Sequence, residues 1–179
     1  MNSLGRYSTL AGFTLGTFLL TGCLQFADST RSLAVAGSQT MLPYAELYFE
    51  AVLSDYADLD QALAAIRAGE TQFRTTLLTA ETRDDVLRTD FDLTGVALYA
   101  TGADKDQLYT DTLVSGRGVT SDWTGEDDRT AFLCVRQLGI PAQPKSASIE
   151  QVTCPENLIA ITFPGAPSEV VSLEEVRGT

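Results

Sequence analysis

The spacing of apolar residues changes near Gly69, and this change constrains the fold more than any other feature of the chain. Between Pro43 and Arg67, apolar residues recur at spacings of three, four or one, which places them on one face of a helix. The stripe consists of Phe49, Val52, Leu53, Tyr56, Leu59, Leu63 and Ile66. Pro43 suits the first helical position and Gly69 the position after the last turn. Asp58, followed three residues later by Gln61, has the form of a cap pair that could start a second helix. We expect the stripe to pack on the core of the domain.

After Gly69 the pattern is typical of strands, with 13 threonines between Thr71 and Thr130 and short alternations bounded by Gly, Asp and Pro. We expect strands over residues 71–79, 91–101, 107–115, 130–138, 147–153, 157–163 and 168–173, and a short helix over 81–88. Connections are expected as a hairpin at 101–106, a turn at 115–118, and an exposed linker with two prolines at 140–146. This order predicts an α+β fold in which an N-terminal helical segment packs on an antiparallel sheet or a small β-sandwich.

The first 22 residues have the layout of a secretory signal. Arg6 supplies one cation, an apolar run over residues 10–20 follows, and two small residues close the segment. The run is too short to span a bilayer easily, because a spanning helix needs roughly 20 predominantly apolar residues. The alternative is an uncleaved anchor helix, since residues 7–27 carry no charge.

The segment Leu20-Thr21-Gly22-Cys23 resembles the lipobox at which bacterial lipoproteins are acylated and cut. The resemblance covers about the first 25 residues, and it implies that Cys23 becomes the mature N-terminus and carries three acyl chains, palmitate among them. More than one chain gives stable membrane anchoring, at about 0.8 kcal/mol per buried CH₂. Leu24, where an aspartate would retain the protein, implies export to the outer membrane. The resemblance therefore places the protein in the bacterial cell envelope, at the periplasmic or the outer surface.

Removal of the signal leaves 157 residues, the size of one ordinary domain with a tether. We expect a signal peptide over 1–22, a lipidated N-terminus and flexible tether over 23–42, and a single domain over 43–179. Most of the tether is Ser, Thr, Ala and Gly, and as a flexible chain it would span on the order of 20–25 Å. Its apolar island at 33–35 could instead be a first strand.

Two cysteines remain once Cys23 carries lipid. Cys134 and Cys154 then form an even pair in an oxidising compartment, where disulfides persist. We predict that they are bonded to each other. The alternative is a pair of buried free thiols.

The charge and the missing histidine exclude several classes of function. Loss of Arg6 leaves 11 basic residues against 24 acidic ones, a net charge of −13. This balance argues against binding nucleic acid, whose phosphates need a basic surface, and against docking on anionic lipid headgroups. The chain has no histidine, which removes Ser-His-Asp and Cys-His nucleophiles and most zinc or copper sites. We therefore predict no catalytic residues, no metal site and no cofactor.

Carboxylates offer two weaker candidate sites. Asp104 and Asp106 begin like a calcium loop, but Tyr109 and Ser115 stand where that loop needs glycine and glutamate. A looser calcium site would add residues 126–128. Paired carboxylates could also hydrolyse glycosides without histidine. The candidates are Asp90, Asp92, Asp111 and Asp122, and nothing in the sequence selects two of them.

Trp123 is the single tryptophan and lies in a polar segment next to glycine, residues 120–125. An exposed tryptophan on a loop could contact a protein partner or a sugar ring, and the alternative is that Trp123 plugs the open end of a sheet. Together these features favour a non-catalytic envelope lipoprotein, anchored in a membrane through its N-terminal lipid, that binds or assembles with an envelope protein. Two alternatives remain: a histidine-free envelope hydrolase using two carboxylates, and an inhibitor of an extracellular hydrolase that presents the loop at 140–146.

Overall fold

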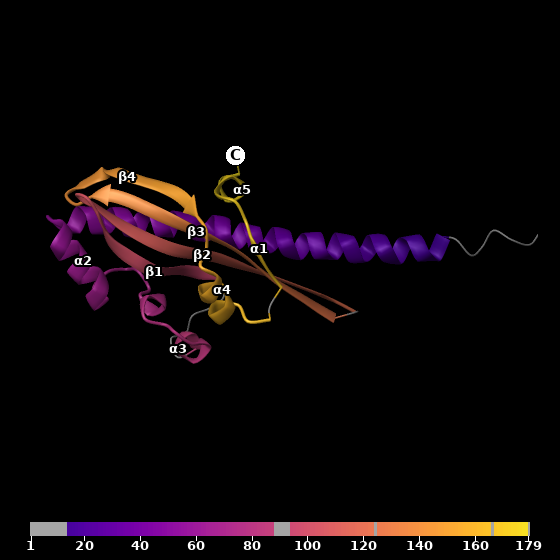
Figure 1. Cartoon of the computed structure of the whole chain (residues 1–179). Helices are drawn as coiled ribbons and strands as arrows, with labels where there is room; N and C mark the ends of the chain where they lie inside the picture. Colours follow the sequence, from indigo (N-terminus) through magenta and orange to yellow (C-terminus); the bar gives the residue numbers. More distant parts are fainter. Residues whose placement is uncertain (1–13, 88–93, 124, 166, 179) are drawn as a thin grey trace, which may run out of the picture.

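The computed structural model describes residues 14–87, 94–123, 125–165 and 167–178, and for residues 14–27, Leu87 and Asp122 it describes the backbone alone. The protein has an α+β fold in which one long helix, α1 (Thr14–Asp55), lies across a five-stranded sheet (Figure 1). The predicted fold class is therefore confirmed. The described strands all belong to one sheet, so the sheet form of the prediction is correct and the sandwich form is wrong.

The helical stripe predicted over residues 43–67 is confirmed, and it divides at the cap pair. α1 ends a short turn before α2 (Leu59–Ala68). The Asp58 side chain accepts a hydrogen bond of 2.9 Å from the backbone N–H of Gln61, which satisfies one of the free donors at the start of α2. Gly69 ends α2 with φ 71°, a left-handed conformation that costs glycine little. The stripe packs on the core, as expected, chiefly against the end of the sheet where α2 lies.

The flexible tether predicted over residues 23–42 is wrong, because α1 continues through this segment. Thr30, Ala34, Ser38 and Leu42 recur every four residues on the face that meets the sheet, and none is more than 3% exposed. Three of these side chains are small, so the sequence shows no apolar stripe here. The folded domain therefore begins well before residue 43, and the alternative of a strand at 33–35 is also wrong.

Pro43 lies inside α1 rather than at its first position. A proline inside a helix costs roughly 3 kcal/mol, since it removes one hydrogen bond and crowds the preceding turn. Contacts with the sheet on both sides of it hold the helix together. Ser38 donates from Oγ to the carbonyl of Ala131 at 2.9 Å, and Gln137 donates from Nε2 to the carbonyl of Ala45 at 3.0 Å.

The sheet is a meander of four antiparallel strands with one short addition. Its strands are β1 (Gly95–Asp104), β2 (Gln107–Asp122), β3 (Gly125–Ile140), β4 (Gln143–Val152) and β5 (Ser168–Val170). The spatial order is β1-β2-β3-β4, and β5 pairs in parallel with β3 where β4 has ended. The strands predicted at 91–101, 107–115, 130–138 and 147–153 are confirmed in their places, although residues 91–93 lie outside the described residues.

Two of the expected connections have a different form. The hairpin at 101–106 is confirmed but is tighter, with its turn at Lys105 and Asp106. The turn expected at 115–118 is wrong, because these residues lie inside β2, which continues with β3 as a long hairpin.

Three expected strands are partly or wholly replaced by other structure. Residues 71–79 form a loop with a short 3₁₀ helix, η1 (Thr76–Leu78). Residues 157–163 belong to α4 (Glu156–Thr162), and 168–173 divide between β5 and α5 (Leu173–Arg177). The short helix expected at 81–88 is confirmed as α3 (Arg83–Leu87).

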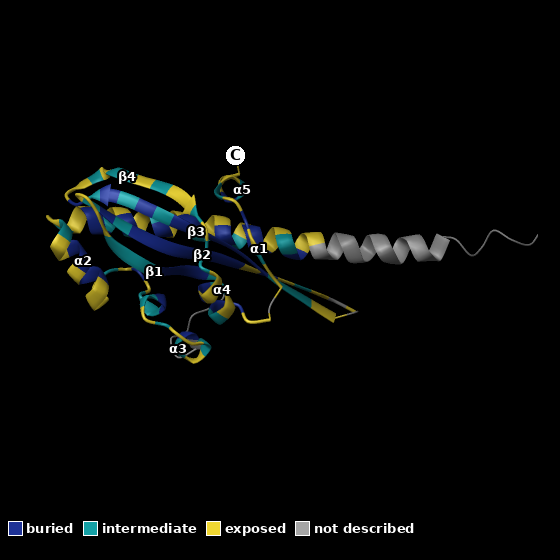
Figure 2. Ribbon diagram, viewed as in Figure 1, coloured by how far each residue is buried: buried dark blue, intermediate teal, exposed yellow. Residues whose placement is uncertain are grey.

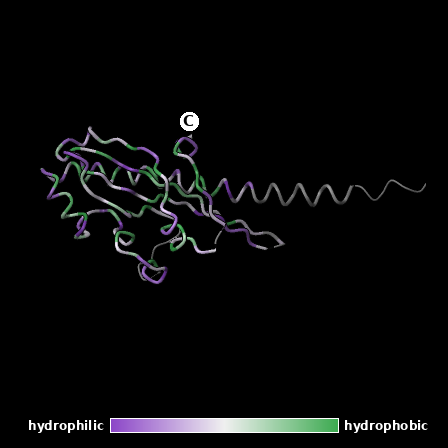
Figure 3. The backbone as a smooth tube through the Cα atoms, viewed as in Figure 1, coloured by the Kyte–Doolittle hydropathy of each residue, from purple (hydrophilic) through white to green (hydrophobic). Residues whose placement is uncertain are grey.

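The two faces of the sheet are covered by different elements. α1 and α5 cover one face, and η1, α3 and α4 cover part of the other. Figure 2 shows that buried residues concentrate in β2 and β3 and on the side of α1 that meets them. In Figure 3 the outer end of the β2–β3 hairpin is mostly hydrophilic, whereas hydrophobic stretches gather in the body of the domain.

α1 crosses β2 at two glycines. A Cβ atom on Gly116 would lie 2.2 Å from the backbone nitrogen of Ser38 and 2.3 Å from the carbonyl oxygen of Ala34. A Cβ atom on Gly118 would lie 2.1 Å from the carbonyl oxygen of Thr30. Because these neighbours are backbone atoms, the helix can approach the strand this closely only where the strand has no side chain. These glycines serve helix packing rather than a turn.

Candidate functional site: an apolar groove beside the disulfide

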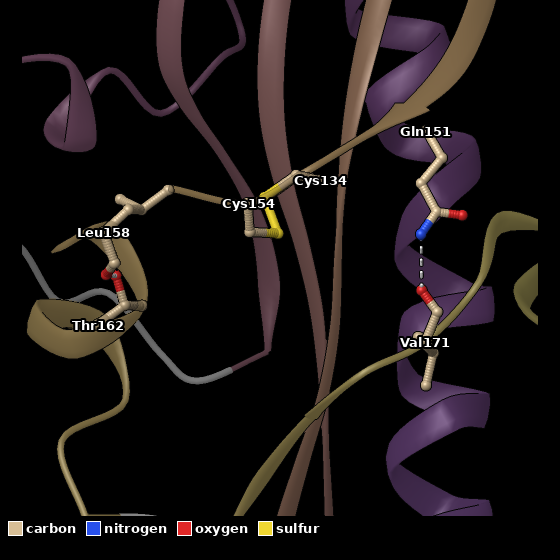
Figure 4. The surroundings of a disulfide bond; sticks show 6 residues. All are labelled: Cys134, Gln151, Cys154, Leu158, Thr162 and Val171. Atoms are coloured by element: carbon tan, nitrogen blue, oxygen red, sulfur yellow. Dashed lines mark hydrogen bonds between the residues drawn. A yellow bond between two sulfur atoms is a disulfide. The ribbon is translucent and has the colours of Figure 1, made fainter. Parts of the chain in front are cut away.

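A disulfide joins Cys134 and Cys154, as predicted (Figure 4). Cys134 lies in the middle of β3 and is fully buried, and Cys154 lies two residues after the end of β4. Their Cα atoms are 5.2 Å apart. The bond therefore fixes the start of the β4–α4 connection on the face of the sheet that carries α4.

An apolar groove of about 740 Å³ opens next to this disulfide, between the end of β4, α4 and β5. We call it the β4–α4 groove. Val170 on its rim is 61% exposed, whereas Phe132 at its base is buried. Its lining residues are Phe132, Gln151, Val152, Thr153, Cys154, Glu156, Ile159, Ala160 and Val170. Glu156 is the one charged side chain in this set, so the groove is suited to apolar groups.

Hydrogen bonds and a ring contact hold the walls of the groove in place. Gln151 on β4 donates from Nε2 to the carbonyl of Val171 at 3.4 Å (Figure 4). Its Oε1 accepts from the N–H of Leu173 at 2.8 Å, so Gln151 ties the segment after β5 to β4. On the α4 side, the Phe163 ring stacks on Phe132 with centroids 5.1 Å apart. These contacts connect both walls of the groove to the sheet.

The end of α4 is also held from outside the groove. Arg83 donates from Nη1 to the carbonyls of Ile161 and Thr162, at 3.1 and 2.6 Å. Carbonyls at the end of a helix have no partner within it, and a guanidinium there satisfies them and complements the helix dipole. This bond fixes α4 to α3.

A polar cluster lies on the same face, farther along β2 and β3. Arg136 donates two hydrogen bonds of 2.7 Å to the carboxylate of Asp111, which is 6% exposed. The guanidinium carbon of Arg136 also lies 4.9 Å from the centre of the Tyr109 ring. The hydrogen bonds that Arg136 donates to Asp111 raise the pKa of Arg136, and burial beside Asp111 raises the pKa of Tyr99. This bidentate ion pair joins β2 to β3 on the face of the sheet that carries α4.

The carboxylates considered for hydrolysis are not brought together in the described residues. Asp111 pairs with an arginine rather than with a second acid. Asp90 and Asp92 lie outside the described residues, and of Asp122 only the backbone is described. The two-carboxylate arrangement therefore has no described pair to support it.

The looser calcium site is contradicted by the topology. Asp104 ends β1 and Asp106 lies in the β1–β2 turn, whereas residues 126–128 follow the β2–β3 turn at the other end of β2. At about 3.3 Å per residue, the two groups are separated by roughly 45 Å. Within the described ranges, no three side chains of the types that bind metals form a cluster.

The segment 140–146, expected as a linker, is a tight turn at Pro141 and Ala142 followed by the first residues of β4, and the turn packs against α1. Ala142 donates its N–H to the carbonyls of Leu53 and Tyr56, at 2.7 and 3.2 Å, and so caps the end of α1. Ser146 accepts from the N–H of Ile140 at 2.7 Å, and Pro141 is buried. The expected linker is therefore wrong from Gln143, where β4 begins, and its exposure is wrong at Pro141, although Ala142, Gln143 and Lys145 are exposed. The disulfide lies at the opposite end of β4 and does not brace this loop.

Trp123 lies at the tip of the β2–β3 hairpin and is 87% exposed. Of the two alternatives considered, plugging the end of the sheet is therefore wrong. The tip projects from the same end of the domain as the N-terminal part of α1 (Figure 1).

The four lipobox residues lie in the first part of α1, where the backbone alone is described. Cleavage before Cys23 would remove the first nine residues of α1. The described contacts between α1 and the sheet begin at Thr30 and would be retained. Within the described residues, no helix is long and apolar enough to cross a membrane.

The groove does not follow from the expected elements, because residues 157–163 are expected as a strand and instead form α4. Ile159, Ile161 and Phe163 alternate with smaller residues, a spacing that is typical of a strand. The helix signal was Pro155 followed by Glu156, since proline and an acidic residue are both favoured where a helix begins.

Comparison with known proteins adds no relative. No family model, curated protein or solved structure matched this chain.

Proposed function

We propose that this protein is a lipid-anchored, non-catalytic component of the bacterial cell envelope that binds an envelope protein. The anchor is Cys23, and the partner inserts an apolar segment into the β4–α4 groove. The observation that carries the binding proposal is the groove itself, an open apolar surface with fixed walls at the edge of the sheet.

The lipobox resemblance at residues 20–23 supports the anchor. The disulfide is consistent with it, because such bonds persist in the oxidising compartments outside the cytoplasm. Since α1 is helical from the anchor to the sheet, the domain would be held close to the bilayer rather than lifted from it by a flexible tether.

The nature of the groove favours a protein partner. Apolar pockets that are open to solvent and bordered by polar residues receive the anchor side chains that dominate binding energy in protein interfaces. Val170, exposed on the three-residue strand β5, offers such a contact at the rim. The polar cluster at Asp111 lies outside the groove lining.

Photo-crosslinking in intact cells tests this function. A photoreactive amino acid replaces Ala160, an exposed residue of the groove lining, and a control carries it at Leu47, an exposed apolar residue of α1 outside the groove. We expect one discrete protein adduct from position 160 and none from position 47. Val170→Lys should abolish the adduct, and Cys23→Ser should lower its yield by releasing the protein from the membrane.

Two results would contradict the proposal. One is the same set of adducts from both positions, which would mean contact by chance. The other is an adduct from position 160 that is unchanged by Val170→Lys. Because Val170 is exposed, this variant should keep its stability within about 0.5 kcal/mol, which a denaturation curve checks.

A further inference from the structure

The hairpin tip and the anchoring cysteine lie on the same side of the domain. Along their contact, residue numbers fall on α1 as they rise on β2: Gly116 meets Ala34 and Ser38, and Gly118 meets Thr30. The helix running back toward its start and the strand running toward the tip therefore point the same way, as Figure 1 shows.

The two segments also extend by the same length beyond their last described contact. That contact is a hydrogen bond between the hydroxyls of Thr30 and Thr120. From Thr30 back to Cys23 are seven helical residues, about 10 Å at 1.5 Å per residue. From Thr120 on to Trp123 are three residues, about 10 Å at 3.3 Å per residue. Trp123 thus lies at the level of Cys23 along the axis of α1.

We propose that Trp123 and the tip of the β2–β3 hairpin form a second membrane contact, with the indole in the interface between headgroups and acyl chains. This inference rests on the proposed lipid anchor at Cys23, which would place the bilayer surface at that level. Tryptophan is enriched in this interface because its ring is apolar and its N–H is polar. A single side chain binds a bilayer weakly, but the anchor makes its insertion an intramolecular event.

The charges of the hairpin indicate which lipid headgroups the tip can contact. Two of its acidic residues are neutralised by pairing, Asp128 with Arg117 at 2.7 Å and Asp127 with Arg129 at 3.2 Å. Glu126 is exposed next to them. A residual negative charge disfavours anionic lipids, so the contact suits zwitterionic headgroups such as phosphatidylethanolamine and phosphatidylcholine. With two points of attachment, the domain would take a fixed orientation on the membrane.

Fluorescence tests this contact directly, because Trp123 is the only tryptophan in the chain. The lipidated protein is purified from membranes and reconstituted in phosphatidylcholine vesicles, with and without bromine-labelled acyl chains. We expect blue-shifted emission, loss of most of the quenching by aqueous iodide, and new quenching by the brominated lipid. A control in the Trp123→Phe background carries Leu47→Trp, an exposed site on α1 about 36 Å from Cys23 at 1.5 Å per residue. Its tryptophan should stay accessible to iodide and be unaffected by bromine.

Sedimentation of the same vesicles separates the two claims. If the protein sediments with the vesicles but Trp123 remains as accessible to iodide as Trp at position 47, the hairpin contact is wrong and the anchor stands. Trp123 would then be free for a protein partner. If the protein stays in the supernatant, the anchor fails and the inference fails with it.

Discussion

Removing the disulfide with the double substitution Cys134→Ala and Cys154→Ala is expected to lower the free energy of unfolding by about 3 kcal/mol. The two cysteines are 20 residues apart, and on the chain-entropy model a crosslink of that length restricts the unfolded chain by about this amount. Guanidinium denaturation of the Cys23→Ser protein, with and without the double substitution, measures the difference. Cys23→Ser removes the proposed lipid attachment site and the only other cysteine in the chain.

Reductant provides the control for the disulfide. It should destabilise the protein that keeps Cys134 and Cys154 and leave the double variant unchanged. Equal stability of the two proteins under oxidising conditions, together with two free thiols by titration in denaturant, would contradict the bond and restore the alternative of buried thiols.

Replacing Gly116 by alanine is expected to destabilise the protein by about 1–3 kcal/mol, the usual cost of overpacking a core. The added Cβ would meet the backbone of Ser38 and Ala34 at 2.2 and 2.3 Å, so α1 would have to move away from β2. Denaturation of the Gly116→Ala and parent proteins measures the change.

Whether Gly116→Ala lowers or raises the free energy of unfolding tells whether α1 contacts β2 at this glycine. Gly116 has no positive φ, so without the contact alanine would stabilise the protein by about 0.4–1 kcal/mol through the unfolded state. Ser121→Ala, an exposed position on the same strand, is the control and should change stability by no more than about 0.5 kcal/mol. A gain in stability for Gly116→Ala would show that α1 does not lie on this strand.

The sequence predicted those elements whose apolar residues are large and regularly spaced. The stripe from Phe49 to Ile66 is of this kind, and so are β2 and β3, where Leu113, Val114, Leu133 and Val135 supply both faces. Asp58 and Gly69 predicted the ends of α2, because a cap depends on one side chain and its own backbone. These signals are local and could be found without tertiary contacts.

The first half of α1 and the glycine crossing could not be predicted in this way. Ala34 and Ser38 are buried by close approach to Gly116 and Gly118, and small residues in both partners give no amphipathic pattern. In sequence alone, glycines separated by one residue predict a turn. Only the contact between segments about 80 residues apart explains why this part of the chain is helical and why the strand continues through its glycines.

The β4–α4 groove could not be predicted from the sequence either, because its lining residues come from β3, β4, α4 and β5, which only the fold brings together. The disulfide that borders it was predictable from the cysteine count, and the exposure of Trp123 was predictable only as one of two alternatives. The correction at the tether changes the functional picture most. With the proposed lipid at Cys23, a helix in place of a flexible spacer would hold the domain and its hairpin close to the membrane surface.

The mass of the intact protein purified from envelope membranes tests the central claim, the lipid anchor at Cys23, most directly. We predict a chain that lacks residues 1–22 and begins at Cys23, with added mass equal to a diacylglyceryl group and one further acyl chain. A chain that keeps its first 22 residues, with an unmodified thiol at Cys23, would contradict the anchor and the orientation built on it.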